Sequence, residues 1–154
     1  MMRRLQKVLR TSLLFSLLLA VVHGNAAEQS SPSVRVKIGT ILATNKSDEF
    51  DPRLKPLAKQ LRVMKYRSYR LLKEDVQTVS WQSHATFEIP GGRSLSITPQ
   101  AFHNKEIALK VRLIEGDKPL LDTTVRLRNR GHFLLGGPPH EGGVLVLSIS
   151  ATTE

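Results

Sequence analysis

Basic and aromatic residues alternate between Lys59 and Lys73, and they form the best candidate binding site in this sequence. Arginine binds phosphate and carboxylate groups through paired hydrogen bonds and stacks on flat rings, and neighbouring tyrosines add aromatic surface. We therefore expect an anionic partner to bind here. The residues that we predict to bind it are Arg62, Lys65, Tyr66, Arg67, Tyr69 and Arg70. The alternative interpretation is an ordinary solvated surface.

The glycine-rich segment from Gly136 to Gly143, GGPPHEGG, is the second candidate site. Glycine lets a backbone come close to a ligand, and Gly136, Gly137, His140 and Glu141 are the residues that could act there. The segment lacks the Lys and the Ser or Thr of a phosphate-binding loop. We predict a loop between two strands, and the alternative to a functional loop is a tight or bulged connection.

Histidines and a carboxylate raise the question of a metal site. His132, His140 and Glu141 could supply two nitrogens and a carboxylate, with His84 and His103 as further candidates. None of them stands in an HxH or HxxxH arrangement, so only the fold could bring them together. The chain also has no Cys and no Gly-x-Ser-x-Gly nucleophile motif. We predict no metal, no cofactor and no enzymatic activity; the alternative is a small hydrolase or metal-dependent enzyme that uses the glycine-rich segment.

Residues 1–27 have the three parts of a secretory signal peptide. A basic start precedes an apolar run from Leu13 to Val22, and small residues follow, ending at Ala27. The apolar run is about half of the roughly 20 residues that a transmembrane helix needs. We predict cleavage near Ala27 with no transmembrane segment afterwards, and retention as a membrane anchor is the alternative. We expect residues 28–33 to be a disordered polar leader and residues 34–154 to be one domain.

Cleavage after residue 27 leaves 127 residues with 19 Lys and Arg against 13 Asp and Glu, a net charge of +6 instead of +10. A chain of this length buries about two thirds of its unfolded surface, so it can fold without cross-links. The absence of Cys excludes disulfides and Cys-based zinc sites. We predict a periplasmic or secreted protein whose partner is another envelope protein or an anionic envelope surface. We expect no nucleic acid partner there.

The stretch from Ile107 to Leu127 predicts a β-hairpin, because alternate residues are apolar on both sides of a polar turn. A five-residue loop, Glu115–Pro119, would connect the strands. The resulting pairs are Ile114 with Leu120, Leu113 with Leu121, Val111 with Thr123, Leu109 with Val125 and Ile107 with Leu127. On the outer face this register places Arg112 opposite Asp122, whereas a shift by two residues would place two cations opposite each other.

The first half of the domain contains the one predicted helix. Alternation predicts a strand over residues 34–43, and a cap at Asp51 and a stripe of apolar residues predict a helix over residues 52–64. Because Pro56 lies beyond the first turn, we expect a 3₁₀ start and a regular helix only from there. Residues 66–73 fit either a strand or an extension of the helix, and we choose the strand, followed by a separate short strand over residues 76–81.

The second half is β throughout. Its pattern predicts a hairpin over residues 86–98, a connection over residues 99–105, a turn over residues 128–131, a short strand over residues 132–135 and a buried strand over residues 144–150. Together these seven or eight short strands and one helix predict a small β-sandwich or a partly open barrel.

Six segments in order resemble a family of short, signal-bearing bacterial proteins known mostly as uncharacterised. They are VRVKIGTILATN, DPRLKPLAKQLR, YRSYRLL, FEIPGGRSLSITP, LLDTTVRLR and LLGGPPHEGGVLVLSIS. The resemblance covers most of the chain after the signal peptide. It implies export and a β-rich fold, and it brings no activity, cofactor or site residue.

A second resemblance rests on LSITP at Leu95–Pro99, strands that end in arginine, a turn at Gly131 and LLGG at Leu134–Gly137. These features are similar to the strand pattern of the C-terminal domain of outer-membrane secretins. The chain lacks the other secretin modules and is too short for the pore-forming domain. The resemblance therefore implies at most an accessory protein at the envelope.

Overall fold

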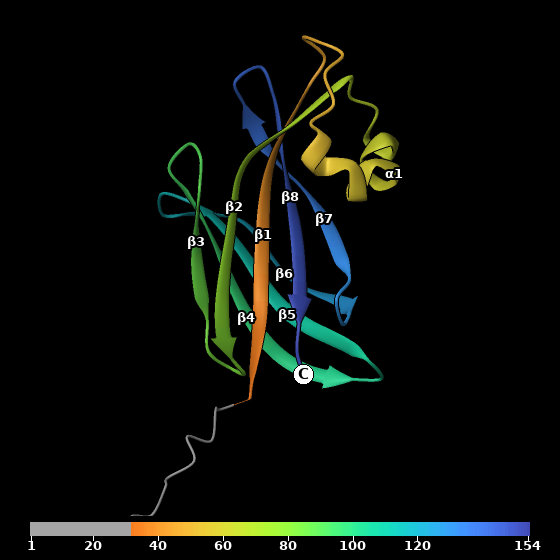
Figure 1. The fold of residues 1–154 in the computed structure, drawn as a ribbon. Coiled ribbons are helices and arrows are strands. Elements are labelled where there is room, and N and C mark those ends of the chain that lie inside the picture. The colour runs from red at the N-terminus through yellow and green to blue at the C-terminus, as the bar shows by residue number, and fades with distance from the viewer. Residues whose placement is uncertain (1–31) are drawn as a thin grey trace, which may run out of the picture.

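Two four-stranded antiparallel sheets face each other in the computed structural model, which describes residues 32–154 (Figure 1). Sheet A has the order β2 (Ser68–Ser80), β1 (Ser33–Thr44), β8 (Gly143–Thr152) and β7 (His132–His140). Sheet B has the order β3 (Ala85–Ile89), β4 (Arg93–His103), β5 (Glu106–Glu115) and β6 (Lys118–Arg128). The prediction of a small β-sandwich with eight strands and one short helix is confirmed. The predicted signal peptide and most of the predicted leader lie outside the described residues, and β1 begins at Ser33, one residue earlier than predicted.

The main core lies between the sheets and comes from the alternation of each strand. Phe87, Ile97 and Leu109 of sheet B are fully buried against residues such as Ile38 and Leu147 of sheet A. β8 lies between β1 and β7, so it is buried on both faces, as its continuous apolar run predicted.

A helical lobe, which we define as residues 52–67, covers the outer face of sheet A at the end opposite to the start of β1 (Figure 1). It consists of a 3₁₀ helix η1 (Pro52–Leu57), one turn of α-helix α1 (Ala58–Leu61) and a second 3₁₀ helix η2 (Arg62–Met64), followed by an irregular stretch. The predicted 3₁₀ start is confirmed, but the regular helix begins at Ala58. Pro56 has no N–H to donate, which removes one of the bonds that an earlier start would need.

The register of the β5–β6 hairpin is confirmed from the pair Leu113–Leu121 down to Ile107–Leu127. Arg112 and Asp122 face each other at 3.2 Å on the outer face. The predicted five-residue loop is wrong. Glu115 pairs with Lys118, which leaves a two-residue turn, and Leu120 is the extra residue of a β-bulge. Gly116 adopts φ +57°, which a turn this tight requires, and the bulge restores the register beyond it.

Two other predicted breaks are absent because β-bulges keep the strands continuous. The predicted strands over residues 66–73 and 76–81 are parts of one strand, β2, which begins only at Ser68 and in which Leu72 is the extra residue. β4 continues through the predicted connection at residues 99–105 as far as His103, with a bulge at Gln100. β3 pairs with β4 only up to Ile97, so Pro99 lies where one side of β4 has no neighbouring strand.

The predicted loop over residues 136–143 is also wrong, because β7 runs on to His140 and pairs there with Gly143. Only Glu141 and Gly142 form the turn, and both have positive φ (45° and 74°), as tight hairpin turns require. Pro138 and Pro139 are compatible with β7 because it is an edge strand. The segment is the bulged connection that was the alternative interpretation.

We predict that Leu61→Ala destabilises the protein by about 2 to 5 kcal/mol. Leu61 is completely buried between the lobe and sheet A, so its truncation leaves a cavity. Urea unfolding measures the change. The matched control is Val63→Ala in the same lobe, where the side chain is 77% exposed and the expected change is within about 0.5 kcal/mol. Similar losses in both variants would contradict the packing of the lobe on the sheet.

Candidate functional site

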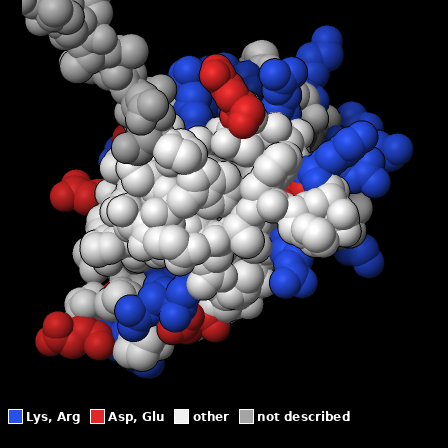
Figure 2. Space-filling view, turned by 90° about the horizontal axis from the view of Figure 1, so that it is seen from below, with Lys and Arg blue, Asp and Glu red and all other residues white. Residues whose placement is uncertain are grey.

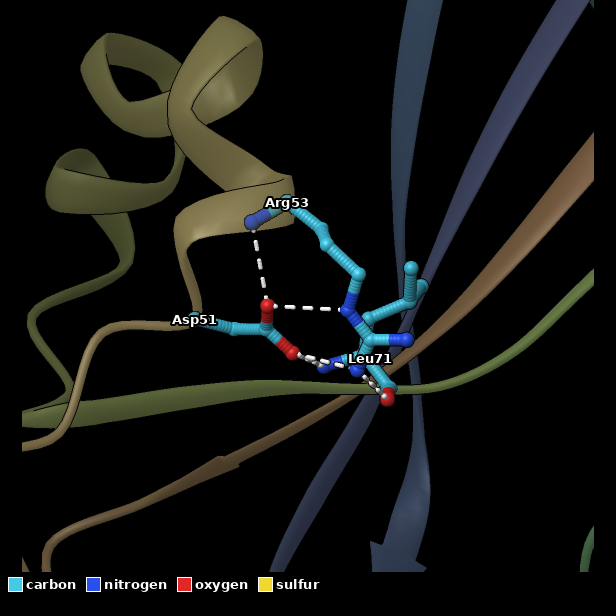
Figure 3. Close-up of polar contacts among 3 residues, drawn as sticks. All are labelled: Asp51, Arg53 and Leu71. Carbon is cyan, nitrogen blue, oxygen red and sulfur yellow. Dashed lines mark hydrogen bonds and ion pairs between the residues drawn. The ribbon is translucent and has the colours of Figure 1, made fainter.

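The Asp51 carboxylate attaches the helical lobe to sheet A (Figure 3). It caps η1 by accepting a hydrogen bond from the backbone N–H of Arg53 (3.0 Å), and it also accepts from the Arg53 side chain at Nε (3.0 Å) and Nη2 (2.7 Å). A fourth bond comes from the backbone N–H of Leu71 on β2 (3.1 Å), and Arg53 Nη2 donates in turn to the Leu71 carbonyl (3.0 Å). The start of the lobe is therefore fixed to the first part of β2.

These hydrogen bonds control the ionisation of Asp51. Its side chain is 9% exposed. The hydrogen bonds from the Arg53 side chain, and next those from the backbone N–H groups of Arg53 and Leu71, hold the pKa of Asp51 far below its usual range, although burial acts in the opposite direction. The group is thus a carboxylate at any pH near neutrality, and its charge is matched by Arg53.

Tyr69, which the sequence placed on the binding surface, lies in the core between the lobe and sheet A. It is 2% exposed, and its hydroxyl donates to the Leu61 carbonyl (2.6 Å) and accepts from the Tyr66 backbone N–H (3.1 Å). Tyr66 is half-buried and packs edge-on against it. Both tyrosines therefore support the lobe and do not form an aromatic binding surface.

The four predicted cations, Arg62, Lys65, Arg67 and Arg70, divide into three groups. Arg67 is held by Asp48 through two short hydrogen bonds (2.8 and 2.6 Å), which also lower the pKa of Asp48. Arg70 lies on the opposite face of β2 from Tyr69 and lines a separate hollow that also contains carboxylates. Of these four predicted residues, only Arg62 and Lys65 are exposed cations of the lobe without an ion pair.

Within the described residues, four exposed cations of the lobe have no ion pair. The lobe contains six Lys and Arg and no Asp or Glu, and the nearby Asp51 and Asp48 are paired with Arg53 and Arg67. The unpaired cations are Lys55, Lys59, Arg62 and Lys65. Figure 2 shows the opposite end of the molecule, at which β1 begins; Lys and Arg side chains lie mainly around the margin of this end, whereas its middle is uncharged.

The β7–β8 turn shows no comparable concentration of functional groups. Gly136 and Gly137 are strand residues, and the His140 side chain lies 3.6 Å from that of the next residue, Glu141. Among residues 32–154, no group of three or more His, Asp or Glu side chains is placed to hold a metal ion. The structure therefore does not bring His84, His103 and His132 to this turn.

No family model, curated protein or solved structure matches this chain. No helix in residues 32–154 is long and apolar enough to cross a membrane.

Sequence analysis missed Lys55, and it placed Lys59 at the start of the basic stretch but not among the residues predicted to bind. It also missed Asp48 and Asp51, which decide which arginines are neutralised. One signal was present: residues 52–73 contain no acidic residue, which is unusual in a chain with 13 Asp and Glu.

We predict that Asp51→Asn lowers the melting temperature by several degrees at pH 7, because it removes the charge that Arg53 faces. A carboxylate with a lowered pKa stabilises the fold above its unfolded pKa of about 4 and loses this contribution as the pH falls towards the folded pKa. The difference between wild type and variant should therefore be constant near neutrality and shrink below about pH 4. Thermal unfolding across this range measures it.

The control for this prediction is Asp48→Asn, which makes the same chemical change at a side chain that is 75% exposed. Solvent screens the pair that Asp48 makes, so we expect almost no change in melting temperature. Equal shifts in the two variants would show that Asp51 does not have the structural role described above.

Proposed function

We propose that this protein is a non-enzymatic, exported binding domain, periplasmic or secreted, that attaches to an anionic surface of the cell envelope through its helical lobe. The observation that carries the proposal is the group of four exposed cations, Lys55, Lys59, Arg62 and Lys65, without acidic neighbours on the lobe. Like charges gathered in one place raise the local potential and attract anionic partners.

The lobe suits this role because it is a fixed support. Leu54, Leu57 and Leu61 anchor it in a second core on the outer face of sheet A, and Asp51 ties its start to β2. A surface that is already ordered loses less conformational entropy when it binds. The cations thus stand on the outer side of a segment whose inner side is buried.

A free sheet edge is the other route by which we expect a β-domain of this kind to bind a partner, because edge strands leave backbone groups unpaired. In this protein the edges are protected against strand addition. Gln77 Nε2 on β2 donates to the Thr86 carbonyl on β3 (2.9 Å), which bridges two edges. β7 contains Pro138 and Pro139, and β6 carries Pro119 next to its bulge. Prolines, bulges and bridging side chains are the usual devices that prevent edge pairing. The basic lobe is therefore the better candidate for a contact surface.

We predict that replacing Lys55, Lys59, Arg62 and Lys65 together by Gln weakens binding to anionic vesicles at least about tenfold, since each cation near such a surface contributes to the attraction. Two probes are used with the chain from Glu28 onward: a heparin column, and vesicles that contain phosphatidylglycerol. If the variant loses binding to vesicles alone, the partner is lipid head groups. If it loses binding to heparin alone, the partner is an acidic glycan. Binding should fall as salt rises.

The matched control replaces four other cations by Gln on sheet B, at Lys110, Lys118, Arg126 and Arg128, which also have no ion pair within the described residues. Both variants then carry the same net charge. If the sheet variant loses as much binding as the lobe variant, or if the lobe variant binds like wild type to both probes, the proposal is wrong.

A further inference from the structure

A groove of about 200 Å³ lies where the helical lobe meets the uncovered half of sheet A. The lobe covers only part of the outer face of this sheet, so its edge forms a wall over the strands. Leu54, Pro56 and Leu57 supply the wall, and Ile41 and Leu71 supply an apolar floor. None of the four cations in the proposed envelope contact lines it.

Gly39 leaves the floor of the groove open. It lies in the interior of the central strand β1, opposite Ser148 on β8 and Glu74 on β2, where a residue with a side chain would be expected. A Cβ at this position would lie 3.5 Å from Ser148 Cβ and 3.6 Å from Leu71 Cδ1, which are ordinary contacts. Packing therefore does not require glycine here. A larger residue would fill the groove.

Ser148 places a polar group on the same floor. The residue is only 7% exposed, and its hydroxyl makes no hydrogen bond to any group in residues 32–154. Its oxygen is not sealed from the surface, since no fully buried side-chain oxygen or nitrogen among the described residues lacks a partner. The hydroxyl is thus free to bond to a molecule in the groove.

Two cations, a histidine and one carboxylate line the rim of the groove. They are Lys37, Arg53, His132 and Glu74. Arg53 is already neutralised by Asp51, and Lys37 lies 3.7 Å from Glu74 with both side chains about half exposed. A loose pair of this kind can exchange one partner for an anionic ligand at small cost. His132 adds a donor on β7, which lies two strands from Lys37 on β1.

We propose that this groove binds a small molecule that has an apolar body and one anionic group. The body packs on Ile41, Leu71 and the leucines of the lobe. The anionic group lies between Lys37 and His132, within reach of the Ser148 hydroxyl. The combination of an apolar pocket with a few polar groups that fix orientation is typical of small-molecule sites. The Asp51 attachment preforms the wall.

The test is a titration of the ¹⁵N-labelled protein, Glu28 onward, with sodium octanoate, followed by ¹H–¹⁵N correlation spectra. We expect saturable shifts of the Gly39, Leu57 and Ser148 amides and weaker binding of 1-octanol, which has the same body without the charge. Gly39→Val should weaken octanoate binding about tenfold or more by filling the groove. It should fold, since β-branched residues favour strands.

The control is Gly136→Val, the same change on β7, where an added Cβ would lie 4.0 Å from Met64 Cε and outside the groove. This variant should bind octanoate like wild type. Ser148→Ala, which adds no volume, should weaken binding several-fold and keeps the test decisive if Gly39→Val does not fold. Absence of saturable shifts, unchanged binding by folded Gly39→Val, or equal binding of octanol and octanoate would each overturn the proposal.

Discussion

The attachment of Asp51 to Arg53 and Leu71 is the interaction on which the position of the basic lobe depends. The lobe has a single turn of α-helix between two short 3₁₀ helices, and isolated helices of that length are not stable in water. Its conformation must therefore come from contacts with sheet A. Leu61 and its neighbours supply apolar contacts without direction, whereas the four hydrogen bonds to one carboxylate fix position and orientation.

The alternation of apolar and polar residues predicted the strand pairing well where one face of a strand is buried and the other is exposed. In the β5–β6 hairpin a slip by one residue would expose Leu109 and Val111, so the register follows from the pattern. The errors are at the extra residues of four bulges, Leu72, Gln100, Leu120 and the pair Gly137 and Pro138. A bulge changes the phase of the alternation locally, and it depends on how the neighbouring strand is placed. Sequence periodicity within one strand does not contain that information.

The candidate site was predicted less well, because the predicted residues are neighbours in the sequence but lie on different parts of the structure. Lys65 takes a left-handed conformation (φ 61°) and ends η2, and the chain then turns into β2, which begins at Ser68. Along β2, Tyr69 and Arg70 then face opposite sides. Which arginines are neutralised depends on Asp48 and Asp51, whose positions relative to β2 come from the fold. The basic composition was visible in the sequence, but its division into paired and unpaired cations was not.

The lobe is an addition to a core that is already complete. The cluster between the two sheets contains no residue from the lobe, and it runs from Val34 to Ala151. A second cluster exists only because Ile41, Ala43 and Val146 on the outer face of sheet A are apolar and covered by the lobe. The outer face of a sandwich can consist of polar residues, so the apolar residues on this half of sheet A are not needed for the core between the sheets. It serves to hold a basic segment in place, and the boundary of the covered half is where the groove forms.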